Sequence, residues 1–143
     1  MTIPGARRGI DIDGAPYGSV VQEGLNQPFM FVFSDHGREL SDPASRQILA
    51  DLQSIYGRLP SGRLLITIRR ANHFSFSDQM LLKSHYVIVL LRIFGFGGLD
   101  GRRGLAITAE YVHTFFDVYL KDAPAELLNK PSQLYPEVQF VLQ

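Results

Sequence analysis

Two aspartates and a histidine each come after an apolar segment of the chain. Asp13 follows the first such segment, Asp35 the second, and His73 comes shortly after the third. In a catalytic triad, a carboxylate holds an imidazole in the required tautomer and stabilises its protonated form, while the imidazole accepts the proton of the nucleophile. An acid after one strand and a histidine after a later strand therefore have the residue types of this acid–base pair.

The three apolar segments have the patterns of β-strands. Segment 9–14 is a short strand-like piece that ends in a turn, and segment 28–33 is a continuous apolar run. Such a run is typical of a strand buried on both faces, which occurs mainly in parallel sheets. Segment 63–69 is rich in β-branched residues and is flanked by Pro60 and Gly62, which predicts a third strand. Because ligands bind at the carboxyl ends of parallel strands, we expect the functional residues there.

Two amphipathic helices accompany these strands. The first is expected to begin at Pro43, with Asp42 as its cap, and to stop at Gly57. Its apolar stripe consists of Ile48, Leu49, Leu52, Ile55 and Tyr56. The second helix is expected over about 104–121 and buries Leu105, Val112, Phe115, Phe116 and Tyr119. The order strand–helix–strand predicts an α/β fold with about three parallel strands, flanking helices and one unprotected sheet edge.

Composition and charge are those of one folded domain over residues 1–143. Hydrophobic residues make up 45% of the chain and charged residues 20%, near the averages of globular proteins. Fourteen basic residues balance fourteen acidic ones, so no binding to nucleic acid is expected. The chain has no cysteine, which excludes disulfides and thiol nucleophiles. No secretory signal is visible, and the longest apolar run, 86–91, is shorter than the ~20 residues of a transmembrane helix. The compartment stays open.

The segments around these residues resemble a known enzyme family. Segment 70–78, RANHFSFSD, looks like the histidine loop of α/β-hydrolases related to platelet-activating factor acetylhydrolase. Segment 9–14, GIDIDG, is similar to the acid-bearing strand of that family, and segment 27–34, QPFMFVFS, to its next strand. Three later segments resemble the bacterial, dienelactone-hydrolase-like members: 99–104, 115–120 and 135–138. The resemblance runs over nearly the whole chain.

This resemblance implies that Asp13 is the triad acid and His73 the general base. The order acid then histidine fits the Ser–Asp–His order of the fold. Asp35 is the alternative acid, because many α/β-hydrolases carry theirs after the strand that segment 28–33 resembles. The nucleophile elbow G-x-S-x-G is absent, since the nearest piece, 17–21, lacks the second glycine and follows the acid. The chain thus resembles a partial α/β-hydrolase that lacks the N-terminal half, and we expect it to be inactive alone.

Two functions from different classes follow. The resemblance implies part of a serine hydrolase that cleaves carboxylic esters through an acyl-enzyme when a nucleophile-bearing half completes it. The alternative is a non-catalytic half-domain that homodimerises or binds a partner, because the open sheet edges of two copies can pair. We expect a homo-oligomer. No cofactor is expected, because the sequence has neither a Gly-rich phosphate loop nor a metal-ligand cluster.

The remaining polar and apolar groups are interpreted as structural. Ser77 and Asp78 are expected to cap or charge a helix over 74–83, and nothing presents Ser75 as a nucleophile. Three histidines without metal-ligand spacing are interpreted as solvated: His36, His85 and His113.

A basic pair and an apolar stretch are the two further segments that could bind a ligand or a partner. The basic pair Arg102 and Arg103 stands beside a glycine turn and makes a poor phosphate site. The apolar stretch 86–98 could be a lid-like helix over an acyl pocket, a buried helix or an interface. Exposed apolar patches usually mark interfaces, and we favour that interpretation.

Overall fold

Strands alternate with helices along the chain. The computed structural model describes residues 8–35, 43–59, 62–76, 86, 89 and 98–142. The elements are, in chain order, β1 (Gly9–Ile12), α1 (Ser19–Glu23), β2 (Phe29–Ser34), α2 (Pro43–Arg58), β3 (Arg63–Ile68), the 3-10 helix η2 (His73–Phe76), α5 (Gly101–Lys121), α6 (Glu126–Asn129) and β4 (Val138–Leu142).

The four strands form one mixed sheet in the order β1-β2-β3-β4. β1, β2 and β3 run parallel, with Gly9 opposite Phe29 and Phe29 opposite Arg63, so the prediction of three parallel strands is confirmed. β4 was not predicted. It runs antiparallel to β3, with Ile68 opposite Val138, and covers the outer edge of β3. Its sequence, VQFVL, is a short and mostly apolar run of five residues, which predicts a strand only weakly on its own.

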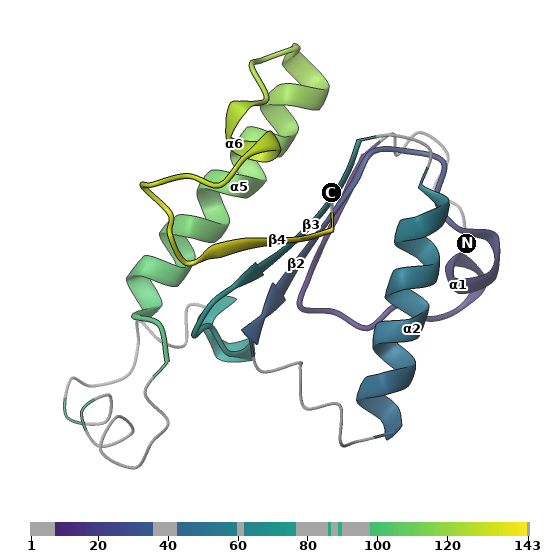
Figure 1. Ribbon diagram of the computed structural model, residues 1–143, viewed down its shortest axis with the longest axis horizontal. Helices are drawn as coiled ribbons and strands as arrows, with labels where there is room; N and C mark the ends of the chain where they lie inside the picture. The colour runs from purple at the N-terminus through teal and green to yellow at the C-terminus, as the bar shows by residue number, and fades with distance from the viewer. Residues whose placement is uncertain are drawn as a thin grey trace.

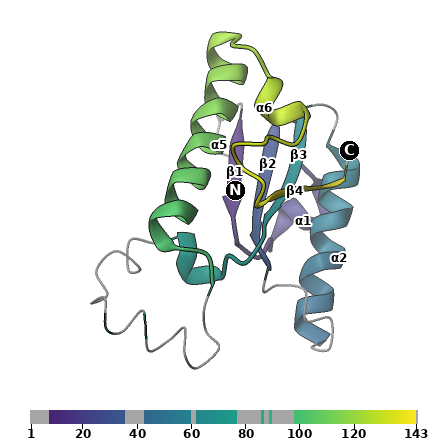
Figure 2. The ribbon, with the colours of Figure 1, turned by 60° about the vertical axis from the view of Figure 1, so that its left-hand side comes forward.

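Helices cover both faces of the sheet, with α2 on one face and α5 on the other (Figures 1 and 2). β2 lies in the interior of the sheet, and its side chains alternate between the two cores, Met30 and Val32 toward α5 and Phe31 toward α2. All three of these side chains are buried. The continuous apolar run predicted such a strand, because neither of its faces meets water.

The helix α2 agrees with the sequence prediction in its second half. Leu52, Ile55 and Tyr56 are buried against the sheet, and the helix ends at Arg58, one residue beyond Gly57. The prediction for Ile48 is wrong, since its side chain is 36% exposed. The first turns of α2 extend past the ends of the strands, where no sheet surface is available to cover them (Figures 1 and 2).

The short helix α1 was not predicted, and Arg58 ties it to α2. The Arg58 guanidinium donates hydrogen bonds to the carbonyl oxygens of Val21 and Gln22, at 2.5 Å for Gln22. It also donates to the Ser54 carbonyl at 3.1 Å. A cation that caps the carboxyl-terminal carbonyl groups of a helix is favourable both as a hydrogen-bond donor and toward the helix dipole. This contact stabilises a helix of only five residues, which is too short to be stable alone.

The helix α5 begins three residues earlier than predicted and buries a different stripe. Asp100 caps it, accepting hydrogen bonds from the backbone N–H groups of Arg102 and Arg103. The fully buried residues at helical spacing are Ile107, Tyr111 and Phe115. Of the five residues predicted to be buried, only Phe115 is, and four are half-buried: Leu105, Val112, Phe116 and Tyr119. The residues that the sequence predicts to be buried therefore lie on a helix face adjacent to the face that packs against the sheet.

Tyr111 carries a buried polar atom. Its hydroxyl has no hydrogen-bond partner among the described residues, and burial raises the pKa of Tyr111 to about 12. Its ring makes an edge contact with Tyr135, 5.9 Å between centroids, which phenylalanine can also make. We expect Tyr111→Phe to raise the free energy of unfolding by about 1 kcal/mol, because a buried unsatisfied hydroxyl is removed. Urea denaturation measures this, and a lower stability of the variant would contradict it.

Several predicted features lie outside the described residues. These are the Asp42 cap, Ser77 and Asp78, His36 and His85, and most of the stretch 86–98. Two side chains of that stretch, Tyr86 and Val89, are described and exposed. None of the helices among the described residues is long and apolar enough to span a membrane.

Candidate active site

Asp13 stands at the carboxyl end of β1 with its carboxylate fixed at both oxygens. Its backbone is left-handed, with φ 52°, and its N–H donates to the Val32 carbonyl at 2.8 Å. Aspartate is among the residues that adopt this conformation at low cost. Oδ1 accepts a hydrogen bond from the Ser34 N–H at 2.8 Å, and Oδ2 lies 2.9 Å from Nδ1 of His73. The side chain is only 11% exposed, so the carboxylate is held in one orientation.

His73 begins η2 and turns its ring toward Asp13. A carboxylate accepts hydrogen bonds, so the contact at 2.9 Å assigns the ring proton to Nδ1 when the imidazole is neutral. In that tautomer Nε2 carries the lone pair and can accept a proton. The side chain is 74% exposed. Because β1 and β3 lie on either side of β2, the pair bridges the carboxyl ends of the parallel strands, where ligands bind in such sheets.

Asn72 and Ser75, on either side of His73, are joined to each other by hydrogen bonds. The Asn72 Oδ1 accepts hydrogen bonds from the N–H and the hydroxyl of Ser75, at 3.1 and 3.2 Å. In return, the Ser75 Oγ accepts from the Asn72 N–H at 3.0 Å. Ser75 is 1% exposed, and its hydroxyl serves this exchange. Such reciprocal bonding is typical of the first turn of a helix.

Asp35, the alternative acid, forms hydrogen bonds to backbone groups of the histidine loop. Its N–H donates to the Ala71 carbonyl at 3.1 Å, and its Oδ2 accepts from the Arg70 N–H at 3.0 Å. Its carboxylate therefore has a hydrogen-bond partner in the loop itself. Asp13, by contrast, is bonded to the imidazole of His73.

Asp11 is a second carboxyl close to the site that the sequence analysis did not single out. Burial raises its pKa, the charge of Asp13 raises it further, and a hydrogen bond from the Gly14 backbone acts in the opposite direction. A Cβ atom at Gly14 would clash with the Asp11 carboxylate, so glycine is needed for this close approach. In the sequence the two carboxyl residues are separated by a single position, as D-x-D, and that spacing is the signal.

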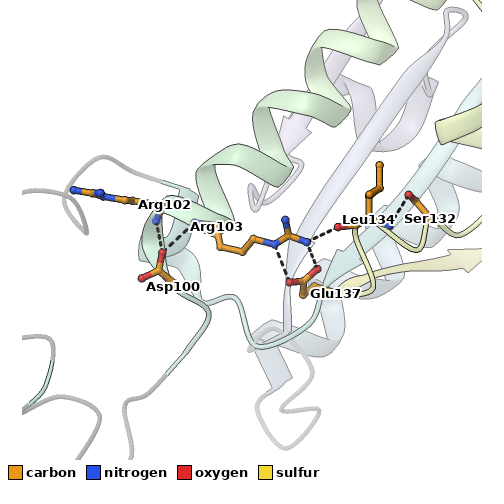
Figure 3. Close-up of polar contacts among 6 residues, drawn as sticks. All are labelled: Asp100, Arg102, Arg103, Ser132, Leu134 and Glu137. Atoms are coloured by element: carbon orange, nitrogen blue, oxygen red, sulfur yellow. Dashed lines mark hydrogen bonds and ion pairs between the residues drawn. The ribbon is translucent and has the colours of Figure 1, made fainter.

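Of the basic pair at the start of α5, Arg103 has a structural role. Arg103 forms two parallel hydrogen bonds to the Glu137 carboxylate, each 2.9 Å, and donates to the Leu134 carbonyl at 2.5 Å (Figure 3). Its guanidinium also lies over the Tyr135 ring, 5.3 Å from the centroid. The Arg103 side chain is therefore engaged in holding the segment before β4.

The ion pair predicts a pH-dependent stability. The hydrogen bonds from Arg103 hold the pKa of Glu137 below its usual value in the folded state. The resulting stabilisation is present above the unfolded pKa, about 4.3, and is lost as the pH falls through the lower folded value. We expect Glu137→Gln to lower the unfolding temperature at pH 7, and expect the difference from wild type to shrink below about pH 4.

Thermal unfolding followed by circular dichroism at pH 7 and below about pH 4 tests this prediction. Glu126→Gln is the control, because Glu126 is 81% exposed and its contact with Lys130 is 3.8 Å long. A difference for Glu137→Gln that stays the same in acid would contradict the assigned pKa direction.

His113 is solvent-exposed on α5, as expected. Its Nε2 lies 3.4 Å from Asp117, which also pairs with Lys121 at 2.7 Å. The Lys121 hydrogen bond lowers the pKa of Asp117. In the part of the chain that the structure describes, no three His, Asp or Glu side chains are grouped so as to hold a metal ion.

Comparison with known proteins identifies the fold of the chain. No protein-family model and no curated protein matches the chain. Among solved structures, it is similar to a ferulic acid esterase from Streptomyces cinnamoneus, with 22% sequence identity and a TM-score of 0.73. The likeness covers 95% of this chain and 40% of the esterase chain, so this chain spans well under half the length of that protein. The expected fold class is confirmed, and the chain has a partial α/β-hydrolase fold.

Proposed function

We propose that this chain supplies the acid and the general base of a serine hydrolase that cleaves carboxylic esters. The observation that carries the proposal is the 2.9 Å contact between Asp13 Oδ2 and His73 Nδ1. A carboxylate anchored in this way fixes the tautomer of the imidazole and stabilises the imidazolium that forms during the reaction. The contact joins the two residues that the sequence assigned to these roles.

The reaction runs through an acyl-enzyme. Nε2 of His73 takes the proton of a serine hydroxyl as the serine oxygen attacks the ester carbonyl carbon. The tetrahedral intermediate collapses, the alcohol leaves with the proton from the imidazolium, and the acyl group stays on the serine. Water then attacks with His73 again as the base, which releases the acid. Because residues 1–143 contain no G-x-S-x-G motif, the serine and the oxyanion-hole donors come from a different polypeptide segment.

Two independent likenesses support this class of substrate. Segments 9–14 and 70–78 resemble the acid strand and histidine loop of hydrolases related to platelet-activating factor acetylhydrolase and dienelactone-hydrolase-like proteins. The structural neighbour is a ferulic acid esterase. Carboxylic esters are common to both, so we propose this class.

We place the serine-bearing segment along the outer edge of β1. The N–H groups of Gly9 and Asp13 donate to the carbonyl oxygens of Pro28, just before β2, and of Val32 in β2, at 3.2 and 2.8 Å. Because N–H groups alternate between the two sides of a strand, those of Ile10 and Ile12 point away from β2. Among the described residues no strand pairs with this edge. A strand added here would end near Asp13 and would help to cover His73.

Fluorophosphonate labelling tests the proposal. The 143-residue chain is labelled alone and when co-expressed with a G-x-S-x-G polypeptide encoded beside it, and adducts are read by intact mass. We expect no stoichiometric adduct on the chain alone, and an adduct on the partner serine that disappears with His73→Ala. An adduct on a serine of this chain, or a partner adduct unaffected by His73→Ala, would refute the proposal.

The edge of β1, which has no strand partner in the part of the chain that the structure describes, also favours a second candidate function, a non-catalytic homodimer. Two copies can pair their β1 edges antiparallel across a two-fold axis, which removes an exposed strand edge from both. A dimer of the isolated chain by light scattering, with no serine labelled in any combination, would favour this function over the first.

A further inference from the structure

The turn that carries His73 contains a strained residue. Arg70 has φ 62°, in the left-handed region that favours glycine. It lies between the end of β3 and η2, three residues before His73. A non-glycine residue keeps such a conformation only where the surrounding structure holds it. The contacts that hold Arg70 therefore bear on where the imidazole lies.

Two neighbouring segments hold this turn by hydrogen bonds. The Asp35 Oδ2 accepts from the Arg70 N–H at 3.0 Å, while the Asp35 N–H donates to the Ala71 carbonyl at 3.1 Å. The second segment contributes the Leu99 N–H, which donates to the Arg70 carbonyl at 2.6 Å. The first of these bonds is made by a side chain, so a substitution at Asp35 removes it and leaves the backbone bonds in place.

We propose that Asp35 is a positioning residue, whose carboxylate holds the left-handed turn at Arg70 and thereby places the His73 imidazole against Asp13. Asp35 directly follows β2, the strand between those that carry the acid and the histidine. Its carboxylate acts as a hydrogen-bond acceptor, and its charge is not required. This inference rests on the proposed function, since it explains how the acid–base pair of that function is assembled.

The acceptor role distinguishes two substitutions at Asp35. Asp35→Asn keeps a side-chain oxygen that can accept from the Arg70 N–H, whereas Asp35→Ala does not. The readout is the proton signal of the hydrogen-bonded His73 Nδ1–H in the NMR spectrum of the 143-residue chain, assigned by its loss in Asp13→Ala. We expect Asp35→Asn to retain this signal and Asp35→Ala to lose it or broaden it beyond detection.

Arg70→Gly supplies an independent test. Glycine adopts positive φ without steric cost, so the turn no longer needs the Asp35 acceptor. We therefore expect Arg70→Gly to restore the signal in the Asp35→Ala background and to leave it unchanged alone. Should Asp35→Ala fail to fold, the restored fold and signal of the double variant decide the question. The gain in unfolding free energy from Arg70→Gly is compared between the wild-type and Asp35→Ala backgrounds: a larger gain with Asp35→Ala shows that the two residues act on the same turn, whereas equal gains show a general loss of stability at Asp35.

Three outcomes would overturn the proposal. These are an unchanged signal in Asp35→Ala, a loss in Asp35→Asn equal to that in Asp35→Ala, and a double variant that recovers nothing. Asp51→Ala is the control, an aspartate of α2 that accepts a hydrogen bond from Gln47 at the helix surface. Failure of the proposed function would leave these results intact, because the signal reports the Asp13–His73 bond and needs no serine.

Discussion

In the hydrolase completed by its serine-bearing segment, Asp13→Asn is expected to lower kcat on the order of 10⁴-fold. The amide keeps the size of the side chain, but it can present its NH₂ group to Nδ1 and favour the tautomer with the proton on Nε2. In that tautomer His73 has no lone pair directed at the serine. The imidazolium also loses the charge that stabilises it. Hydrolysis of a p-nitrophenyl ester, followed as kcat and KM separately, measures the effect.

The two residues of the pair are expected to act as a unit. His73→Ala removes the base itself, so adding Asp13→Asn to it should lower kcat little further. Asp51→Asn, on the exposed surface of α2, is the matched control and should retain wild-type rates. Losses that multiply in the double variant would mean that Asp13 acts on the reaction by a route other than His73, which would contradict the pair.

Much of this site could be predicted because its parts are local in sequence. The strand patterns before Asp13 and His73 fix which end of a parallel sheet each residue occupies, since parallel strands share their carboxyl edge. Resemblance of the flanking segments then assigned the roles. Whether Asp13 or Asp35 meets the imidazole could not be decided in this way, because both follow neighbouring strands at the same edge.

The remaining features depend on backbone contacts that side-chain patterns do not encode. The donor to Asp13 Oδ1 is the N–H of Ser34, which any residue except proline could provide. The hydrogen bond from the Arg70 N–H to the Asp35 carboxylate is formed at a left-handed residue, and arginine gives no sequence signal for that conformation. β4 is recognisable only once β3 offers an edge for it, because a run of five residues carries too little pattern alone.

Ile12→Lys is expected to weaken any assembly through the edge of β1 by roughly threefold to tenfold in dissociation constant. Ile12 is 39% exposed in this chain, beside an edge whose outward N–H groups have no strand partner among the described residues. Full burial of an isoleucine is worth about 1.5–3 kcal/mol, so covering the 39% of Ile12 that is still exposed is worth roughly 0.6–1.2 kcal/mol. A lysine there forfeits that burial and must keep its ammonium group hydrated. Charged side chains on edge strands are also a common means of preventing strand pairing.

The dissociation constants of the Ile12→Lys variant separate the two candidate functions, because they can be measured both for the serine-bearing complex and for self-association of the isolated chain. Ile48→Lys is the matched control, since Ile48 is 36% exposed but lies on α2, away from the sheet edge. Sedimentation of each variant gives the dissociation constants. Weaker binding of the serine-bearing partner by Ile12→Lys alone would support completion of the hydrolase sheet along β1. The same loss seen only in self-association would identify β1 as a homodimer edge, and equal behaviour of the two lysine variants would exclude β1 from either interface.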